Sequence, residues 1–207
     1  MTEEEARSWV RERFGVSRET MLEAFGAILV AEAEHQNLIS RSTLDSLWAR
    51  HLTDSAQLVP LAASAPDGVW LDVGSGAGLP GLVVALLTER PVVLVEPRAK
   101  RVSFLREAAE QLGVADRVTV VGTKVETLRL KRPVAVVSAR AVAELSSLML
   151  STVHCTDSST VWLLPKGRSA QSEVDAARAK WQGRFHVEPS ITQPESGIVV
   201  ATQIGAR

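Results

Sequence analysis

The sequence predicts an α/β fold in which helices cover both faces of a seven-stranded, mostly parallel sheet. From about residue 69 onward, short β-branched runs alternate with helical patterns, which is typical of parallel strands joined by crossover helices. The last two strand candidates, 185–188 and 198–203, are separated by a turn with proline and glycine that leaves no room for a helix. This ending predicts an antiparallel C-terminal hairpin. The 207 residues, 45% of them hydrophobic, suffice for one such core with a short extension.

The first part of the chain is predicted to be helical. Apolar residues at helical spacing indicate helices over 3–14, 18–36 and 43–59. Ser17 is expected to cap the second helix, and Pro60 to end the third. Small residues with a proline and a glycine at 62–68 indicate a linker. We therefore expect residues 1–61 to form a helical extension packed on the core, and 62–207 to form a cofactor-binding domain.

The remaining elements follow in strict alternation. Strands are predicted over 69–73, 92–96, 118–121, 134–138 and 160–164, and helices over 79–88, 99–112, 141–151 and 170–181. Together with the final hairpin, this pattern suits a Rossmann-like class I methyltransferase better than a nicotinamide-binding fold.

Composition narrows the function further. The net charge of −1 argues against a general nucleic-acid binder. Residues 1–34 carry eight acids and four arginines, so an acidic segment precedes a mildly basic remainder. Cys155 is the one cysteine, and the four histidines lack zinc-site spacing, so we expect no metal. No signal peptide or membrane-spanning run is evident, so we expect a cytoplasmic protein without a membrane partner. The oligomeric state is not predicted.

A glycine-rich segment follows the first strand and predicts the cofactor site. The segment reads DVGSGAGLPG over residues 72–81. Glycine permits unusual backbone angles and close approach of a ligand, and we expect free N–H groups where such a turn opens a helix. Glu96, at the end of the second strand, is placed to accept hydrogen bonds from ribose hydroxyls. The predicted cofactor-binding residues here are Asp72, Gly74, Ser75, Gly76, Gly78, Leu79 and Glu96.

Two cofactors compete for this loop. Residues 76–81 also satisfy the dinucleotide pattern G-x-G-x-x-G. Asp72, however, puts a carboxylate where a cationic amino-acid tail can be held and a pyrophosphate would be repelled. S-adenosyl-L-methionine (SAM) is therefore favoured over NAD.

Further motifs carry a family resemblance over roughly residues 34–170. They are Glu96 with KRVSFLR at 100–106, SARA at 138–141, PKG at 165–167, RHLTDS at 50–55 and QNL at 36–38. In this order, and with the glycine loop, they resemble the 16S rRNA guanine-N7 methyltransferases, also called ribosomal RNA small-subunit methyltransferase G or glucose-inhibited division protein B.

The resemblance implies methylation at N7 of a guanosine, position 527 in standard rRNA numbering, with 16S rRNA or the 30S subunit as partner. It carries cofactor contacts over to Gly74, Leu79, Val125, Glu126 and Arg140. It also makes Arg140 and Lys124 the candidates for catalytic roles. Lys124 stands where the family usually has arginine, so the charge is kept but the planar fork is lost.

The chemistry agrees with these residues. Guanine N7 has a free lone pair, so no general base is needed and positioning is the main task. Because methylation makes the base cationic, arginines are expected to hold phosphates or the cofactor carboxylate. Arg140 is the best candidate, and the alternative is an arginine that caps a helix.

The predicted substrate-binding residues are His51, Asp54, Lys100, Arg101 and Lys166. For His51 and Asp54 the alternative is a structural pair three residues apart on a helix. For the lysines and arginine the alternative is ordinary solvated charge.

Three other functions stay open on the sequence alone. They are a methyltransferase of another RNA, a protein or a small molecule; a nicotinamide-dependent oxidoreductase; and a cofactor-binding regulator without catalysis. Thermal shift with S-adenosylhomocysteine against NAD separates the oxidoreductase from the others.

Overall fold

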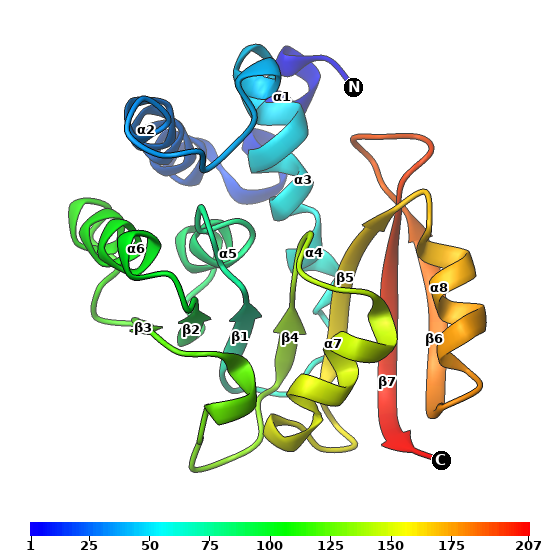
Figure 1. Cartoon of the computed structure of the whole chain (residues 1–207). Coiled ribbons are helices and arrows are strands. Elements are labelled where there is room, and N and C mark those ends of the chain that lie inside the picture. The colour runs from blue at the N-terminus through cyan, green and yellow to red at the C-terminus, as the bar shows by residue number, and fades with distance from the viewer.

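A computed structural model describes residues 1–207, apart from the side chain of Arg41. Seven strands form one sheet in the order β3-β2-β1-β4-β5-β7-β6 (Figure 1). They are β1 (Trp70–Val73), β2 (Val92–Val95), β3 (Val118–Val121), β4 (Val136–Ser138), β5 (Val161–Gly167), β6 (Trp181–Pro189) and β7 (Gly197–Ala206). Pairs from β3 to β5 are parallel, and β7 runs antiparallel to both β5 and β6. The predicted fold class, including the C-terminal hairpin, is confirmed.

Helices lie before the sheet and between its strands. The α-helices are α1 (Glu3–Phe14), α2 (Val16–Glu32), α3 (Thr53–Ala56), α4 (Leu58–Leu61), α5 (Gly81–Leu87), α6 (Ala99–Gln111), α7 (Leu145–Thr152) and α8 (Ala170–Ala177). The shorter turns are η1 (Arg41–Ser46), η2 (Trp48–Leu52), η3 (Val125–Thr127) and η4 (Val153–Cys155). Within the part of the chain that the structure describes, no helix is long and apolar enough to cross a membrane.

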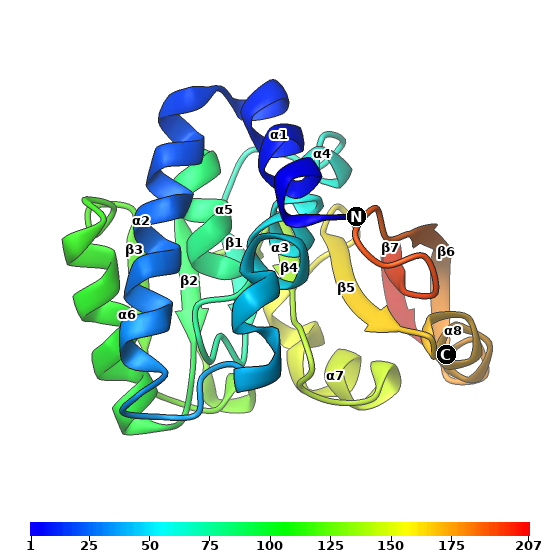
Figure 2. The ribbon, with the colours of Figure 1, turned by 90° about the horizontal axis from the view of Figure 1, so that it is seen from above.

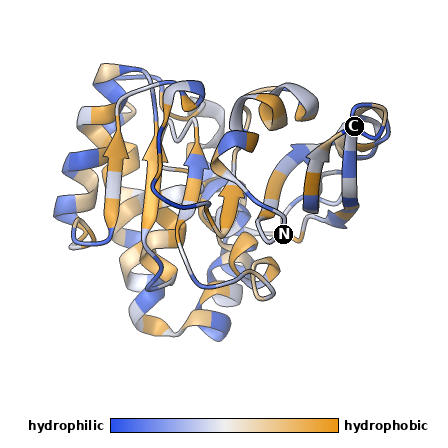
Figure 3. Ribbon diagram, turned by 90° about the horizontal axis from the view of Figure 1, so that it is seen from below, coloured by the Kyte–Doolittle hydropathy of each residue, from blue (hydrophilic) through white to orange (hydrophobic). Residues whose placement is uncertain are grey.

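The hydrophobic core lies on both faces of the sheet, because successive strand side chains point to opposite faces. Trp70 and Leu94 face a cluster that α2, α5 and α6 complete, whereas Leu71 and Val93 face one that includes side chains of α7 and α8. Figure 3 shows the strands as mostly hydrophobic ribbons.

The N-terminal helices share the first of these clusters. Val10 of α1 and Phe25 of α2 are fully buried in it together with Trp70. Helix α2 packs against α5, and Figure 2 shows it running alongside α5 and α6. One continuous apolar core therefore joins residues before and after the predicted linker.

Several predicted boundaries are wrong. Gly15, with a φ of +87°, ends α1 and begins α2, so Ser17 is not the cap, and α2 ends at Glu32 instead of continuing to 36. The helix predicted over 141–151 starts only at Leu145, because Ala141 has the non-helical φ of +55°. The amide of Ser146 is capped by the Glu144 side chain.

The helix predicted over 43–59 is divided into η1, η2, α3 and α4. The Glu3 carboxylate accepts hydrogen bonds from the amides of Trp48 (2.9 Å) and Ala49 (2.8 Å). Those amides are therefore satisfied by a side chain of α1, much as a cap would satisfy a helix start. Pro60 lies within α4, in the first turn, where its missing N–H costs nothing.

The C-terminal hairpin is longer than predicted. Helix α8 ends at Ala177, and Trp181, predicted to be helical, begins β6. The Trp181 side chain is buried in a cluster with Ala177 and Phe185. Burial of this indole beneath α8 explains why the strand starts so early.

Candidate active site

The glycine loop lies at the carboxyl end of β1, the edge where ligands bind in open α/β sheets. Gly74, Gly76 and Gly78 have φ angles of +68°, +53° and +80°, which residues other than glycine rarely adopt. Several amides of the loop, however, are not free. Gly74 and Ser75 donate to the Val95 carbonyl, at 2.8 and 3.1 Å. The expectation of free N–H groups is therefore wrong for these amides, and the glycines serve the shape of the loop.

Asp72 supports this loop from beneath. It is fully buried, and its carboxylate accepts hydrogen bonds from Ser138 Oγ (2.7 Å) and the Gly81 amide (3.3 Å). Burial raises the pKa of Asp72 to about 6, although these hydrogen bonds oppose the shift. The carboxylate thus ties β1 to β4 and to the start of α5. Its direct contact with a cofactor stays a prediction.

Glu96 stands at the end of β2 against the loop. Its two oxygens accept from the amides of Gly76 (2.9 Å) and Arg98 (3.0 Å). Arg101 Nη1 of α6 lies 4.0 Å from the same carboxylate, and Arg101 Nη2 lies 3.5 Å from the Asn37 carbonyl. The structure therefore brings Arg101, predicted to contact substrate, over the predicted ribose site. Lys100 is exposed on α6.

Arg140 follows β4 and joins the two substrate candidates of the N-terminal segment. Its Nη1 lies 3.3 Å from Asp54 Oδ2, and its Nη2 lies 3.4 Å from His51 Nδ1. His51 and Asp54 therefore converge on Arg140. Asp54 Oδ1 also accepts from Gln57 Nε2 and from Thr192 Oγ1, both at 2.9 Å. Asp54 thus connects three segments: its own helix, the loop after β4 and the β6–β7 loop.

His51 is neutral at pH 7. Burial, and then the positive charges of Arg140 and Arg50, lower its pKa to about 4. Because a guanidinium can only donate, Nδ1 accepts from Arg140 and Nε2–H donates to Thr43 Oγ1 at 2.8 Å. His51 therefore orients the arginine without adding charge.

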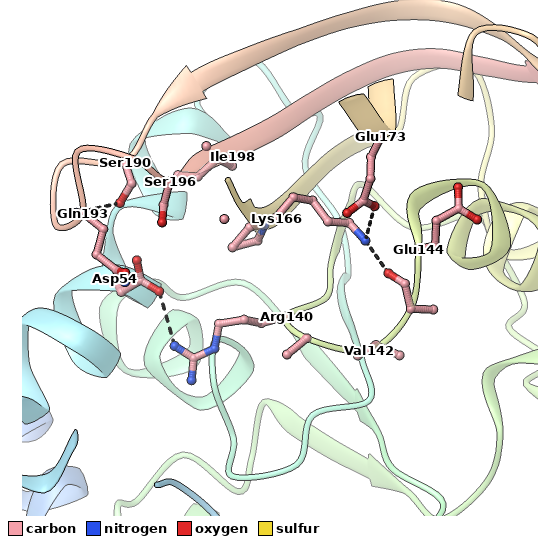
Figure 4. Close-up of a pocket in the computed structure, with 15 residues that line it drawn as sticks. Asp54, Arg140, Val142, Glu144, Lys166, Glu173, Ser190, Gln193, Ser196 and Ile198 are labelled. Carbon is pink, nitrogen blue, oxygen red and sulfur yellow. Dashed lines mark hydrogen bonds and ion pairs between the residues drawn. The ribbon is translucent and has the colours of Figure 1, made fainter. Parts of the chain in front are cut away.

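Lys166 lies near the end of β5, across a cavity from Arg140 (Figure 4). Its side chain is only 9% exposed, with Nζ 3.1 Å from Glu173 Oε2 of α8. It also donates to the Ala143 carbonyl. Glu173 in turn accepts from the Leu145 amide at 2.8 Å, so this pair fixes the far end of the loop after β4.

The candidates after β3 are less closely tied to the rest. Val125 is buried in the hydrophobic cluster with Leu128, whereas Lys124 and Glu126 are exposed. Among the described side chains, neither Lys124 nor Glu126 takes part in an ion pair. Their predicted roles toward cofactor or catalysis stay predictions.

Sequence reasoning missed Glu173 and Thr192, and it did not recognise Val142 as part of the site. Glu173 and Thr192 become neighbours of the site only through the packing of α8 and the turn of the hairpin, for which the local sequence carries no signal. Val142 follows the quoted motif SARA directly, so its closeness to the loop could have been inferred from that motif. No group of three or more His, Cys, Asp or Glu in the described residues is arranged to hold a metal ion.

Solved structures share this architecture. The O-methyltransferase TomG from Streptomyces achromogenes, in complex with SAM, has a TM-score of 0.61 at 14% identity, covering 88% of this chain and 90% of that one. The glycopeptide N-methyltransferase MtfA, complexed with SAM, has a TM-score of 0.60 at 13% identity, covering 73% and 87%. The fold is that of the Rossmann-like class I methyltransferases.

Within that class, the chain belongs to the rRNA small subunit methyltransferase G (GidB) family, whose model matches residues 18–197. A ribosomal RNA small subunit methyltransferase G from Rhizorhabdus wittichii is 51% identical, covering all of this chain and 95% of its own. One from Zymomonas mobilis is 46% identical, covering 99% and 95%. The predicted family is confirmed and the oxidoreductase alternative is excluded. SAM, predicted from the glycine loop, is the cofactor of this class.

Proposed function

We propose that this enzyme transfers the methyl group of SAM to N7 of a guanosine in 16S rRNA, the nucleoside at position 527. The observation that carries the proposal is family membership over residues 18–197, together with a glycine loop at the carboxyl end of β1 and Glu96 beside it. An rRNA substrate implies action in the cytoplasm, on 16S rRNA or the 30S subunit.

The glycine loop and Glu96, here called the cofactor cradle, fit the nucleoside and tail of this cofactor. Each Glu96 oxygen accepts one backbone N–H, which leaves acceptor capacity for ribose hydroxyls. The space above Gly74 and Gly76 is bordered by the side chains of Val142 and Arg101, since an added Cβ would lie 2.7 and 3.3 Å from them. Both are partly exposed and can change rotamer to admit a ligand. Gly74, Leu79, Glu96 and Arg140 would hold the cofactor.

The cofactor supplies an activated methyl group, and the protein supplies position. Guanine N7 attacks with its own lone pair, so no side chain has to remove a proton. The rate then depends on holding N7 in line with the methyl group at near-attack distance, and such positioning can accelerate a reaction by several orders of magnitude. The paired charges around the cavity suit a base that becomes cationic, because Asp54 faces Arg140 and Glu173 faces Lys166. Each carboxylate limits the repulsion that an unpaired cation would add.

The test is transfer of labelled methyl from SAM to small subunits that lack the modification. Incorporation into 16S rRNA supports the proposal. A Gly76→Val variant is the matched negative control, because valine strains the φ of +53° and meets Arg101. Absence of incorporation by the wild-type enzyme, with S-adenosylhomocysteine binding intact, would direct the search to another RNA, a protein or a small molecule.

A further inference from the structure

A cavity of about 560 Å³ lies beside the cofactor cradle, at the carboxyl ends of β4 and β5 (Figure 4). Its size is typical of sites for small ligands. One wall comes from Arg140 and Val142, and the opposite wall from Pro165, Lys166 and Ile198. Among the described residues, none from 72–79 lines it, and neither does Glu96. Val142 lies between the two spaces, since it lines the cavity and its side chain comes within 2.7 Å of where a Cβ on Gly74 would be.

We propose that this cavity receives the target guanine, that Lys166 Nζ donates to its O6 atom, and that Glu173 positions the lysine. The inference rests on the proposed function and names the binding site for its substrate base. Extruding the base from a single-stranded rRNA loop costs less than from a duplex, and a base-modifying enzyme needs a pocket for it.

The lysine has one donor to offer. An ammonium group has three N–H bonds, and here two are directed at Glu173 and at the Ala143 carbonyl. Glu173 is itself held by the Leu145 amide (2.8 Å) and Ser169 Oγ (2.6 Å). Among the described partners, this accounts for two donors and leaves the third for a ligand in the cavity.

The chemistry of guanine selects this arrangement. Its N7 and O6 acceptors lie side by side on one edge, and adenine has an amino donor in place of O6. A single donor can hold O6 and leave the N7 lone pair free, whereas the two-pronged guanidinium of an arginine takes both atoms. A lysine at this position therefore favours guanine over adenine and keeps N7 open to the methyl group.

The same pair disfavours a phosphate as the occupant. Lys166 is nearly buried and its charge is balanced by Glu173 at 3.1 Å, so an incoming anion meets a carboxylate as well as an ammonium. The neutral carbonyl oxygen of a base meets no such repulsion.

The test compares Lys166→Met, Lys166→Arg and the control Lys180→Met, whose lysine is exposed in the turn after α8 and does not line the cavity. The assay measures kcat/KM for methylation of unmodified small subunits and the Kd of S-adenosylhomocysteine. We expect kcat/KM to fall at least about tenfold in both Lys166 variants, with the Kd within about twofold and Lys180→Met unchanged. Full activity of Lys166→Arg would overturn the proposal in favour of a phosphate contact, and a tenfold weaker Kd would assign the cavity to the cofactor.

A second measurement changes the base, so its main comparison uses the wild-type enzyme alone. In the substrate subunits, 2-aminopurine, which lacks O6, replaces guanine at the target position. On these subunits, the kcat/KM of the wild-type enzyme should fall by about the factor that Lys166→Met loses on guanosine. The kcat/KM of Lys166→Met should fall little further when the base is changed. Equal wild-type activity on both bases would overturn the inference while leaving the proposed function intact, and no wild-type activity on guanosine would refute the proposed function itself. Glu173→Gln should reduce kcat/KM without changing the Kd, as a positioning residue should.

Discussion

Removing the negative charge of Asp54 should release Arg140. The substitution Asp54→Asn keeps the shape of the side chain and one acceptor oxygen, so the hydrogen bond that Thr192 donates to Oδ1 can remain. It removes the charge that faces Arg140 Nη1 at 3.3 Å. If Arg140 acts on cofactor or rRNA from this position, the variant should lose activity through the arginine alone.

The size of the effect follows from the geometry. Across 3.3 Å, the direct attraction is about 5 kcal/mol at an effective dielectric constant of about 20. The side chains are 20% and 11% exposed, so desolvation offsets much of this attraction, and asparagine keeps the hydrogen bonds that Gln57 and Thr192 donate to Oδ1. A net loss of about 1–2 kcal/mol remains, which corresponds to a fall in kcat/KM of about 5- to 30-fold.

A double-mutant cycle checks this reasoning. Arg140→Ala alone should weaken S-adenosylhomocysteine binding or turnover, and Arg140→Ala with Asp54→Asn should be no worse than Arg140→Ala. Asp45→Asn, which removes an exposed carboxylate from the same segment, is the control and should be silent. Additive losses in the double variant would show that Asp54 does not act through Arg140.

Three further predictions concern pH, cofactor and substrate. Because the pKa of Asp72 is raised from 3.8 to about 6, its ionisation costs up to about 3 kcal/mol of stability as pH rises. In urea titrations, the free energy of unfolding of the wild type should therefore fall by about 1.4 kcal/mol relative to Asp72→Asn between pH 5 and 7.5. A difference between the two proteins that stays constant with pH would contradict this. Glu96→Gln should raise the Kd of S-adenosylhomocysteine about tenfold, since an amide replaces a charged acceptor, whereas the exposed Glu107→Gln should leave it unchanged. The net charge of −1 suggests reliance on ribosomal shape, so methylation of assembled subunits should be about tenfold faster than that of protein-free rRNA; equal rates would refute this.

Local sequence was sufficient where local forces decide the structure. Strand β3 was predicted with its observed limits, 118–121, because a short β-branched run leaves little choice. The region 43–59 was not, because its interruption depends on Glu3, a residue some 45 positions away. A long-range cap of this kind has no signature in a window of sequence.

The site shows the same division. The motifs named His51, Asp54, Arg140 and Lys166 as candidates, but not that the first three meet in one network. Their meeting requires the N-terminal segment to pack across the end of β4. The partner of Lys166 could not be predicted either, since Glu173 reaches it only once α8 lies beside β5.

The most direct test of the central claim is to map the methylated atom. After reaction with SAM and unmodified small subunits, the rRNA is treated to cleave the chain at N7-methylguanosine. We expect one new cleavage, in the decoding-region loop at position 527. Methyl incorporation without any cleavage would place the methyl group on another atom and contradict the claim.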